Sequence, residues 1–266
     1  MKIVSHSAGV LAMTSGEWRI WSLSDGHVDM EATLLRDAGD NPFPATVKAE
    51  DRVRLSVNCF VVVSPDGQSV LIDCGAGGSW EPTMGKLGAV MEEAGIDPAS
   101  ITTMAATHAH EDHVSGLLTP DGRALLPKLD AILIGEDAVK GFLAKTHLAT
   151  FRPLLKPVRD GDRLESGLQA VALPGHAPGH VGYALRTGED QFLFFGDVVH
   201  VPALQFADPT ISWGYDDDQP TARITRLNVL RQAASQGTWI AGAHLGRPGI
   251  GRVASKDSSY IYEPAG

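Results

Sequence analysis

Short apolar stretches bounded by turn-forming residues recur along the chain and predict β-strands. Two of the early stretches are joined by Ser64-Pro65-Asp66-Gly67, a sequence typical of a tight turn. The predicted strands are residues 18–23, 53–63, 69–72, 102–107, 131–134, 168–173, 181–185, 191–195, 239–241 and 260–262.

Two stretches have the three-to-four-residue spacing of apolar side chains that predicts helices. The first ends at Gly95, and its apolar residues are Leu87, Val90, Met91 and Ala94. The second covers residues 220–236, begins with a proline and is followed by Gly237. Its predicted buried face consists of Ile224, Leu227, Leu230 and Ala234.

Hairpin-like early strands, followed by strands that alternate with helices, predict an α/β fold with two mixed sheets flanked by helices rather than a parallel barrel. The sequence has no internal repeat or low-complexity tract, and residues 37–44 (DAGDNPFP) are typical of a loop. We therefore predict one domain over residues 1–266, in which residues 1–50 form an N-terminal strand and loop extension.

Composition narrows the class of protein. The chain has 266 residues, 43% of them hydrophobic, and a net charge of −10. A negative surface repels nucleic acid and anionic lipid, and no apolar run approaches the ~20 residues of a membrane span. We expect neither a nucleic acid nor a membrane partner. Cys59 and Cys74 form no paired motif, and no signal peptide is evident, which favours free thiols and a cytoplasmic location.

The strongest chemical signal is the sequence His108-Ala109-His110-Glu111-Asp112-His113. It follows a predicted buried strand, where His108 and His110 project to the same side of extended backbone. Asp112 and His113 come after the bend and can face a second point. One tetrahedral zinc ion rarely takes four ligands from six residues, so the spacing indicates two adjacent metal ions.

Three more predicted strands end in residues that bind metals. Pro174-Gly175-His176-Ala177-Pro178-Gly179-His180 follows one, Gly196-Asp197 follows another, and His244 follows the third. Imidazole and carboxylate ligands suit zinc, and also manganese, iron or cobalt. We expect two divalent metal ions per chain.

These motifs, with Leu71-Ile72-Asp73-Cys74-Gly75, resemble in order and spacing those of the metallo-β-lactamase-fold hydrolases. The resemblance implies an αββα sandwich with its site between the two sheets. It places His108, His110 and His176 at one metal, and Asp112, His113 and His244 at the other, with Asp197 bridging. It also places Asp73 beside a ligand that it orients, and we expect a similar hydrogen-bonding role for His180.

The sequence around Asp197 and the segment from Gly242 to Gly251 look most like the methyl parathion hydrolase and lactonase branch of that superfamily. Gly246 and Arg247 stand where that branch usually has proline and phenylalanine. His200 stands where acyl-homoserine lactonases commonly have a tyrosine, so it is a candidate donor to the substrate as well as a candidate structural histidine.

Other side chains carry weaker signals. Trp80 follows the strand that should open beside the metals and is the best candidate for the substrate pocket. The remaining pocket candidates are Phe142, Phe151 and Trp213, and we expect His6, His27 and His147 to be ordinary exposed side chains.

Together these features predict a dinuclear metallohydrolase. A metal-bridging hydroxide would attack an ester, lactone or phosphotriester of a small, mainly apolar substrate. Asp112, or water bound to the second metal, would pass a proton to the leaving group. The alternatives are a glyoxalase II-like thioesterase, whose glutathione site only Arg247, Arg252 and Lys256 could supply, and a mononuclear iron persulfide dioxygenase. The net charge argues against a nuclease of the same fold, and a homodimer is expected from the family alone.

Overall fold

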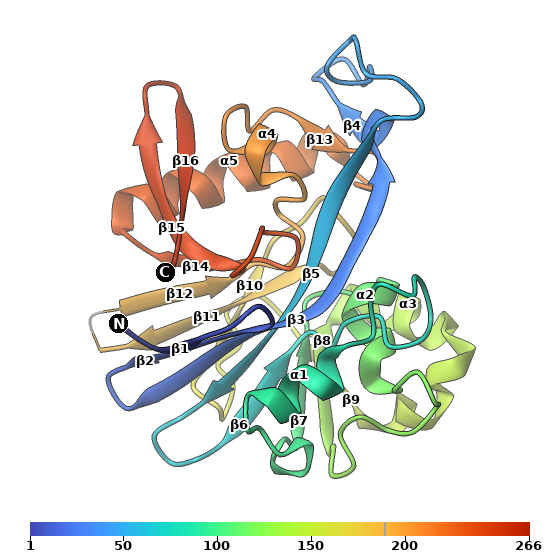
Figure 1. Cartoon of the computed structure of the whole chain (residues 1–266), viewed down its shortest axis with the longest axis vertical. Coiled ribbons are helices and arrows are strands. Elements are labelled where there is room, and N and C mark those ends of the chain that lie inside the picture. Colours follow the sequence, from blue (N-terminus) through green and yellow to red (C-terminus); the bar gives the residue numbers. More distant parts are fainter. Residues whose placement is uncertain (189) are drawn as a thin grey trace.

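Two β-sheets packed face to face form the centre of the protein, and helices cover their outer faces (Figure 1). The computed structural model describes residues 1–188 and 190–266. The layered αββα arrangement predicted from the sequence is confirmed.

The first sheet has eight strands in the order β1-β2-β3-β5-β6-β7-β8-β9. Strands β1, β2, β3, β5 and β6 pair antiparallel, and β6, β7, β8 and β9 pair parallel. The strands are β1 (Lys2–His6), β2 (Val10–Ser15), β3 (Trp18–Glu31), β5 (Arg52–Val63), β6 (Ser69–Ile72), β7 (Thr103–Ala106), β8 (Ala131–Gly135) and β9 (Leu155–Val158).

The second sheet has six strands in the order β10-β11-β12-β14-β15-β16, and within it only β12 and β14 pair parallel. A small sheet joins β4 (Leu35–Arg36), above the long β3–β5 hairpin, to β13 (Ser212–Trp213). The strands of the second sheet are β10 (Gln169–Ala172), β11 (Val181–Thr187), β12 (Asp190–Phe194), β14 (Trp239–Ala241), β15 (Ile250–Lys256) and β16 (Ser259–Pro264).

The longest helix, α5 (Gln219–Gln236), packs on the second sheet. It begins where the Asp218 side chain accepts a hydrogen bond from the Thr221 backbone N–H and ends at Gly237, whose φ is 62°. The other α-helices are α1 (Leu87–Glu93), α2 (Glu111–Val114), α3 (Val139–Ala144) and α4 (Pro202–Gln205), and 3₁₀ turns cover Ala32–Leu34, Pro98–Ser100, Ser115–Leu117, Glu136–Ala138 and Thr146–Leu154. Across residues 1–188 and 190–266, no helix is long and apolar enough to cross a membrane.

The two-residue period of β5 shows how the layers are held together. Cys59, Val61 and Val63 point into the core between the first sheet and its helices. Phe60 and Val62 point into the core between the sheets, where the rings of Phe60 and Phe194 lie 5.4 Å apart. A strand buried on both faces is continuously apolar, as this segment is, and each such side chain contributes about 1.5–3 kcal/mol by burial.

Several details differ from the sequence predictions. Strands β1, β2, β4, β9, β13 and β15 were not predicted. Strand β1 is exposed at every residue and its sequence shows no apolar alternation. Strand β3 runs to Glu31, well past the predicted end at residue 23. The predicted face of α5 is wrong at two of its four positions: Ile224 and Leu227 are 59% and 37% exposed, whereas Leu230 and the charged Arg226 are fully buried and Ala234 packs against the core. Arg226, which has hydrogen-bond partners in the interior, occupies part of the buried face of α5 where apolar periodicity predicts hydrophobic residues.

Candidate metal centre

Histidine and aspartate side chains from four loops meet at one edge of the sandwich. The loops follow β7, β10, β12 and β14 directly and so bring together residues from both sheets. The first loop continues into α2, whose four residues include Asp112 and His113. All seven ligands expected from the sequence lie in this centre.

Four overlapping groups of candidate ligands lie here, and within each group the ligand atoms are within 4.8 Å of one another. His200 belongs to two of them, with His176 and Asp216 and with Asp197 and His244, and the seven expected ligands make up the other two groups. The carboxylate of Asp197 lies between the groups. Its Oδ1 is 3.2 Å from His113 Nε2, and its Oδ2 is 3.3 Å from His176 Nε2 and 3.0 Å from His244 Nε2. One group is His108, His110, His176 and Asp197, and the other is Asp112, His113 and His244.

Unpartnered polar atoms test whether these residues suit a metal. His108 Nε2, His113 Nε2 and Asp197 Oδ1 are buried and make no well-aligned hydrogen bond among the described residues, although the last two atoms lie 3.2 Å apart. Leaving such atoms buried and unpaired costs about 1–3 kcal/mol each. Because imidazole nitrogens and a carboxylate are the ligands that zinc and similar divalent ions prefer, the donor set fits the metal ions expected from the sequence.

In several of these histidines, the ring nitrogen that faces away from the centre contacts a residue behind it. His113 Nδ1 lies 2.8 Å from Asp73 Oδ2, and His244 Nδ1 lies 2.8 Å from the backbone oxygen of Ser56. His108 Nδ1 lies 3.1 Å from Thr107 Oγ1. These contacts turn each Nε2 toward the centre, which is the usual function of residues behind metal-binding histidines. Asp73 therefore lies where the sequence resemblance places it.

Burial and charge determine which rings stay neutral. Burial lowers the pKa of His108 and His176 well below the usual value for histidine, so both keep the lone pair that a metal needs. Burial also acts on His113, but the nearby carboxylates of Asp197, Asp112 and Asp73 outweigh it and raise its pKa. Burial alone would raise the pKa of Asp197, but the nearby rings of His113 and His244 outweigh burial and lower it.

His180 and His200 occupy different places around Asp197. His180 Nδ1 is 2.8 Å from the Leu173 oxygen, and its Nε2 accepts a hydrogen bond from the Asp197 backbone N–H at 3.1 Å. His200 lies beside the carboxylate itself, with Nε2 3.3 Å from Asp197 Oδ2. Burial lowers the pKa of His200 to about 4, so its ring is neutral at ordinary pH.

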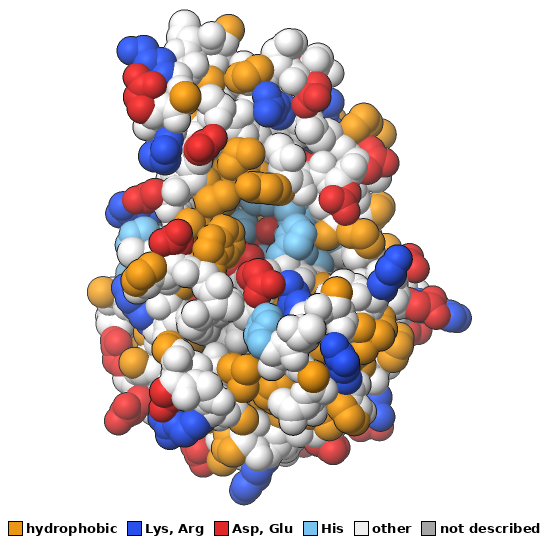
Figure 2. Space-filling view, turned by 90° about the vertical axis from the view of Figure 1, so that its right-hand side faces the viewer, with side chains coloured by type: hydrophobic (Ala, Val, Ile, Leu, Met, Phe, Trp, Pro, Cys, Tyr) orange, Lys and Arg blue, Asp and Glu red, His pale blue; other side chains and the backbone are white. Residues whose placement is uncertain are grey.

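A cavity of about 360 Å³ opens directly onto these residues. Figure 2 shows histidine side chains at the bottom of a hollow that hydrophobic side chains border. Of the predicted pocket residues, Trp80 and Trp213 line the cavity. Phe142 and Phe151 were wrongly placed there: they are 0% and 5% exposed and pack in the core beside the first sheet, where apolar rings are most stable.

The structure adds residues that the sequence analysis missed. Met30, Leu55 and Tyr215 also line the cavity, and Asp216 lies 2.8 Å from His176 Nδ1. Met30 and Leu55 belong to the long hairpin of β3 and β5, whose length was underestimated. Asp216 is the first of three consecutive aspartates in a loop, and nothing in their spacing indicates which one is buried.

A cluster of candidate metal ligands at the junction of two sheets in an αββα sandwich agrees with a class of metal-dependent enzymes. The profile of the metallo-beta-lactamase superfamily matches residues 52–244, and the chain belongs to this superfamily. It is therefore a hydrolase.

Comparison with individual proteins agrees with this class. A structure described as hydrolase AbOPH in the beta lactamase superfamily is 28% identical, with a TM-score of 0.87 over 98% of this chain and 99% of that one. The dizinc quorum-quenching lactonase AidC, solved with the product N-hexanoyl-L-homoserine, is 20% identical, with a TM-score of 0.82 over 97% and 98% of the chains, and so shares the fold.

A sequence relative is the hydroxyacylglutathione hydrolase of Saccharophagus degradans, 32% identical over 107 residues. The match covers 38% of this chain and 35% of the relative. The chain thus matches only about a third of that protein's length.

Proposed function

We propose that the chain binds two divalent metal ions, with zinc the first candidate, and hydrolyses an ester, lactone or phosphotriester of a small, mainly apolar substrate. The observation that carries the proposal is the pair of ligand groups on either side of Asp197, open to a 360 Å³ cavity. The dizinc lactonase with the same fold gives further support.

Two metal ions bound here would activate water and polarise the carbonyl or phosphoryl oxygen that is attacked. The chain's own residues supply the rest. His200 faces the cavity as a neutral imidazole, which can donate one hydrogen bond to a developing negative charge. Asp112 also lines the cavity, with Oδ2 3.5 Å from His244 Nε2, and in this proposal it passes a proton to the leaving group.

The walls of the cavity favour an uncharged substrate. Five large apolar or aromatic side chains line one part of it, and two are well exposed, Trp80 at 42% and Tyr215 at 55%. On the other part, Lys145 Nζ pairs with Glu111 Oε1 at 2.6 Å, so the lysine charge is compensated. The five side chains are Met30, Leu55, Trp80, Trp213 and Tyr215.

The proposal is tested by purifying the protein, measuring metal content, and assaying p-nitrophenyl esters, γ- and δ-lactones, a phosphotriester and S-lactoylglutathione. We expect close to two metal ions per chain and turnover of at least one neutral ester, lactone or phosphotriester. Full hydrolytic activity with one ion per chain would overturn the dinuclear centre, and one ion per chain with no hydrolysis of any of these substrates would favour the persulfide dioxygenase.

A glyoxalase II-like thioesterase is the second candidate, because the curated relative is a hydroxyacylglutathione hydrolase. Its substrate carries carboxylates that need cationic partners. None of Arg247, Arg252 and Lys256 lines the cavity in the described residues, and Arg252 instead stacks on Trp239 with 4.3 Å to the ring centre. Turnover of S-lactoylglutathione above that of every neutral substrate would reverse this ranking.

A further inference from the structure

Asp216 uses its two carboxylate oxygens for two different parts of the site. Oδ1 lies 2.8 Å from His176 Nδ1, and Oδ2 accepts a hydrogen bond from the Trp213 backbone N–H at 3.0 Å. His176 belongs to the metal centre, whereas Trp213 forms a wall of the cavity. One buried carboxylate therefore contacts both.

Each contact fixes the direction of a functional group. Because His176 Nδ1 faces Asp216, its Nε2 points into the centre, 3.1 Å from His110 Nδ1 and 3.3 Å from Asp197 Oδ2. Trp213 lies with its ring stacked on His200 at 5.3 Å between ring centres. The position of Trp213 thus affects both the cavity wall and the imidazole beside the reacting groups.

A buried arginine holds the carboxylate in place. Arg226 of α5 is fully buried, and its Nη2 lies 3.6 Å from Asp216 Oδ2. Its other nitrogens donate to the backbone oxygens of Val198, Pro209 and Ile211, the first of which follows Asp197 directly. A buried arginine satisfied in this way keeps the loops around the carboxylate in a fixed arrangement.

We propose that Asp216 is a positioning residue that couples metal binding through His176 to the shape of the substrate cavity through Trp213. The inference rests on the proposed function, since it takes His176 to be a metal ligand. In this proposal Asp216 is not a metal ligand, because its Oδ1 contacts His176 Nδ1 and not the Nε2 that faces the centre. It acts by fixing the Nε2 of His176 toward the centre and the backbone of Trp213 beside His200.

The Asp216→Asn variant separates this role from a general structural one. An asparagine of the same shape offers only one acceptor oxygen, so it cannot accept from both His176 Nδ1–H and Trp213 N–H. The adjacent Asp217→Asn variant is the matched control, because Asp217 is exposed and its side chain has no hydrogen bond among the described residues.

Zinc is titrated into metal-free wild type and both variants against a chromophoric chelator, with folding checked by circular dichroism. We expect Asp216→Asn to weaken one of the two zinc sites by about 10- to 100-fold, the usual effect of losing a residue behind a metal-binding histidine. At saturating zinc, we expect KM for a p-nitrophenyl ester to rise about 2- to 10-fold, as for one lost hydrogen bond. Asp217→Asn should match wild type in zinc affinity and in KM.

A double variant tests whether the effect passes through His176. In a His176→Gln background, Asp216→Asn should cause no further loss of zinc affinity. A further loss there, or wild-type zinc affinity in the single variant, overturns the inference. Failure of wild type itself to bind two zinc ions would instead overturn the proposed function.

A second measurement needs no change at Asp216. In nitrogen-15 spectra of the zinc-loaded protein, the His176 ring, assigned by its loss in His176→Gln, should carry its proton on Nδ1. A proton on Nε2 would contradict the proposed orientation even if Asp216→Asn does not fold.

Discussion

The ring of Trp213 stacks on the ring of His200 with 5.3 Å between the centres and 15° between the planes. His244 stacks on His200 as well, at 5.3 Å and 23°. The imidazole is therefore held between a cavity wall and a proposed metal ligand. Contacts between aromatic rings of this kind contribute about 0.5–1.5 kcal/mol beyond burial, so the position of the His200 ring is well defined.

The His200→Ala variant should lose activity without losing metal. We expect kcat/KM to fall by about 10- to 1,000-fold, the effect of removing one donor that acts in the transition state. Metal content per chain should stay as in wild type. Unchanged kinetics would make His200 a structural histidine.

The His200→Tyr variant should favour lactones relative to phosphotriesters, as measured by kcat/KM on one substrate of each kind.

The lowered pKa of His200 also predicts how the fall in kcat/KM of the His200→Ala variant depends on pH. A group with a pKa of about 4 is already deprotonated at higher pH, so its hydrogen-bond donation does not change there. We expect the ratio of wild-type to His200→Ala kcat/KM to be constant between about pH 5.5 and 8. An inflection in the ratio near the ordinary histidine value would show that the ring titrates in this range.

The Asp197→Asn variant should affect both metal ions at once. The change keeps the side-chain volume but removes the charge that faces both ligand groups. We expect weaker binding of both ions and a kcat lower by about 100-fold or more. The control is Asp257→Asn, an exposed turn residue with a φ of 51°, a conformation that asparagine also adopts. Near wild-type turnover with both ions bound would refute the bridging role.

Trp80 and Phe142 should respond in opposite ways to alanine. Phe142 is fully buried in the core, so Phe142→Ala should lower the free energy of unfolding by about 3–5 kcal/mol in urea titrations. Trp80 is 42% exposed at the cavity, so Trp80→Ala should cost less than about 1 kcal/mol while raising KM for apolar substrates. A raised KM without loss of stability in Phe142→Ala would instead indicate that Phe142 lines the substrate pocket.

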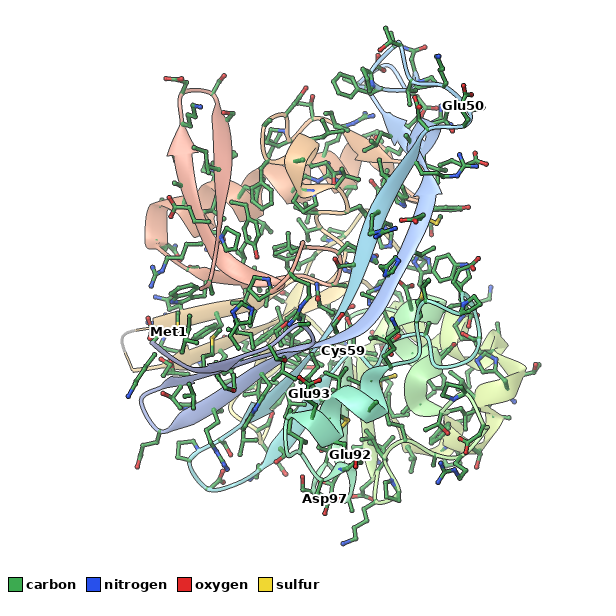
Figure 3. All side chains as sticks on the ribbon, in the orientation of Figure 1. Met1, Glu50, Cys59, Glu92, Glu93 and Asp97 are labelled. Carbon is green, nitrogen blue, oxygen red and sulfur yellow. The ribbon has the colours of Figure 1, made fainter. Side chains whose placement is uncertain are left out.

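The two cysteines should not react in the folded protein. Cys59 lies on β5 in the interior (Figure 3), and burial raises the pKa of both Cys59 and Cys74 well above the usual range. A thiol with a raised pKa stays protonated, and the reactive thiolate is absent at pH 8. A thiol-specific disulfide reagent should therefore detect neither cysteine in native protein and both after unfolding. Rapid labelling before unfolding would contradict the burial.

The layers, and the strand ends at which the seven candidate ligands meet, could be predicted from the sequence because both depend on local patterns. Continuous apolar strands such as β5 are recognisable on their own, and each proposed ligand directly follows a predicted strand. The same reasoning could not find Asp216, whose role depends on α5 and β13 meeting in space. Nor could it place Phe142, because an aromatic side chain has the same sequence signal in a core as in a pocket.

The proposed ligands are spread between loops of both sheets, with His108 after β7 and His244 after β14. During synthesis the ribosome releases the segment with His108, His110, Asp112 and His113 long before β14 has been made. A nascent chain that stops short of β14 therefore lacks a ligand, and in the complete chain the strands of the second sheet must dock before the ligands meet. Of the two proposed metal sites, the group of His108, His110, His176 and Asp197 needs no residue from this last segment, so the group that includes His244 would be the last to be completed.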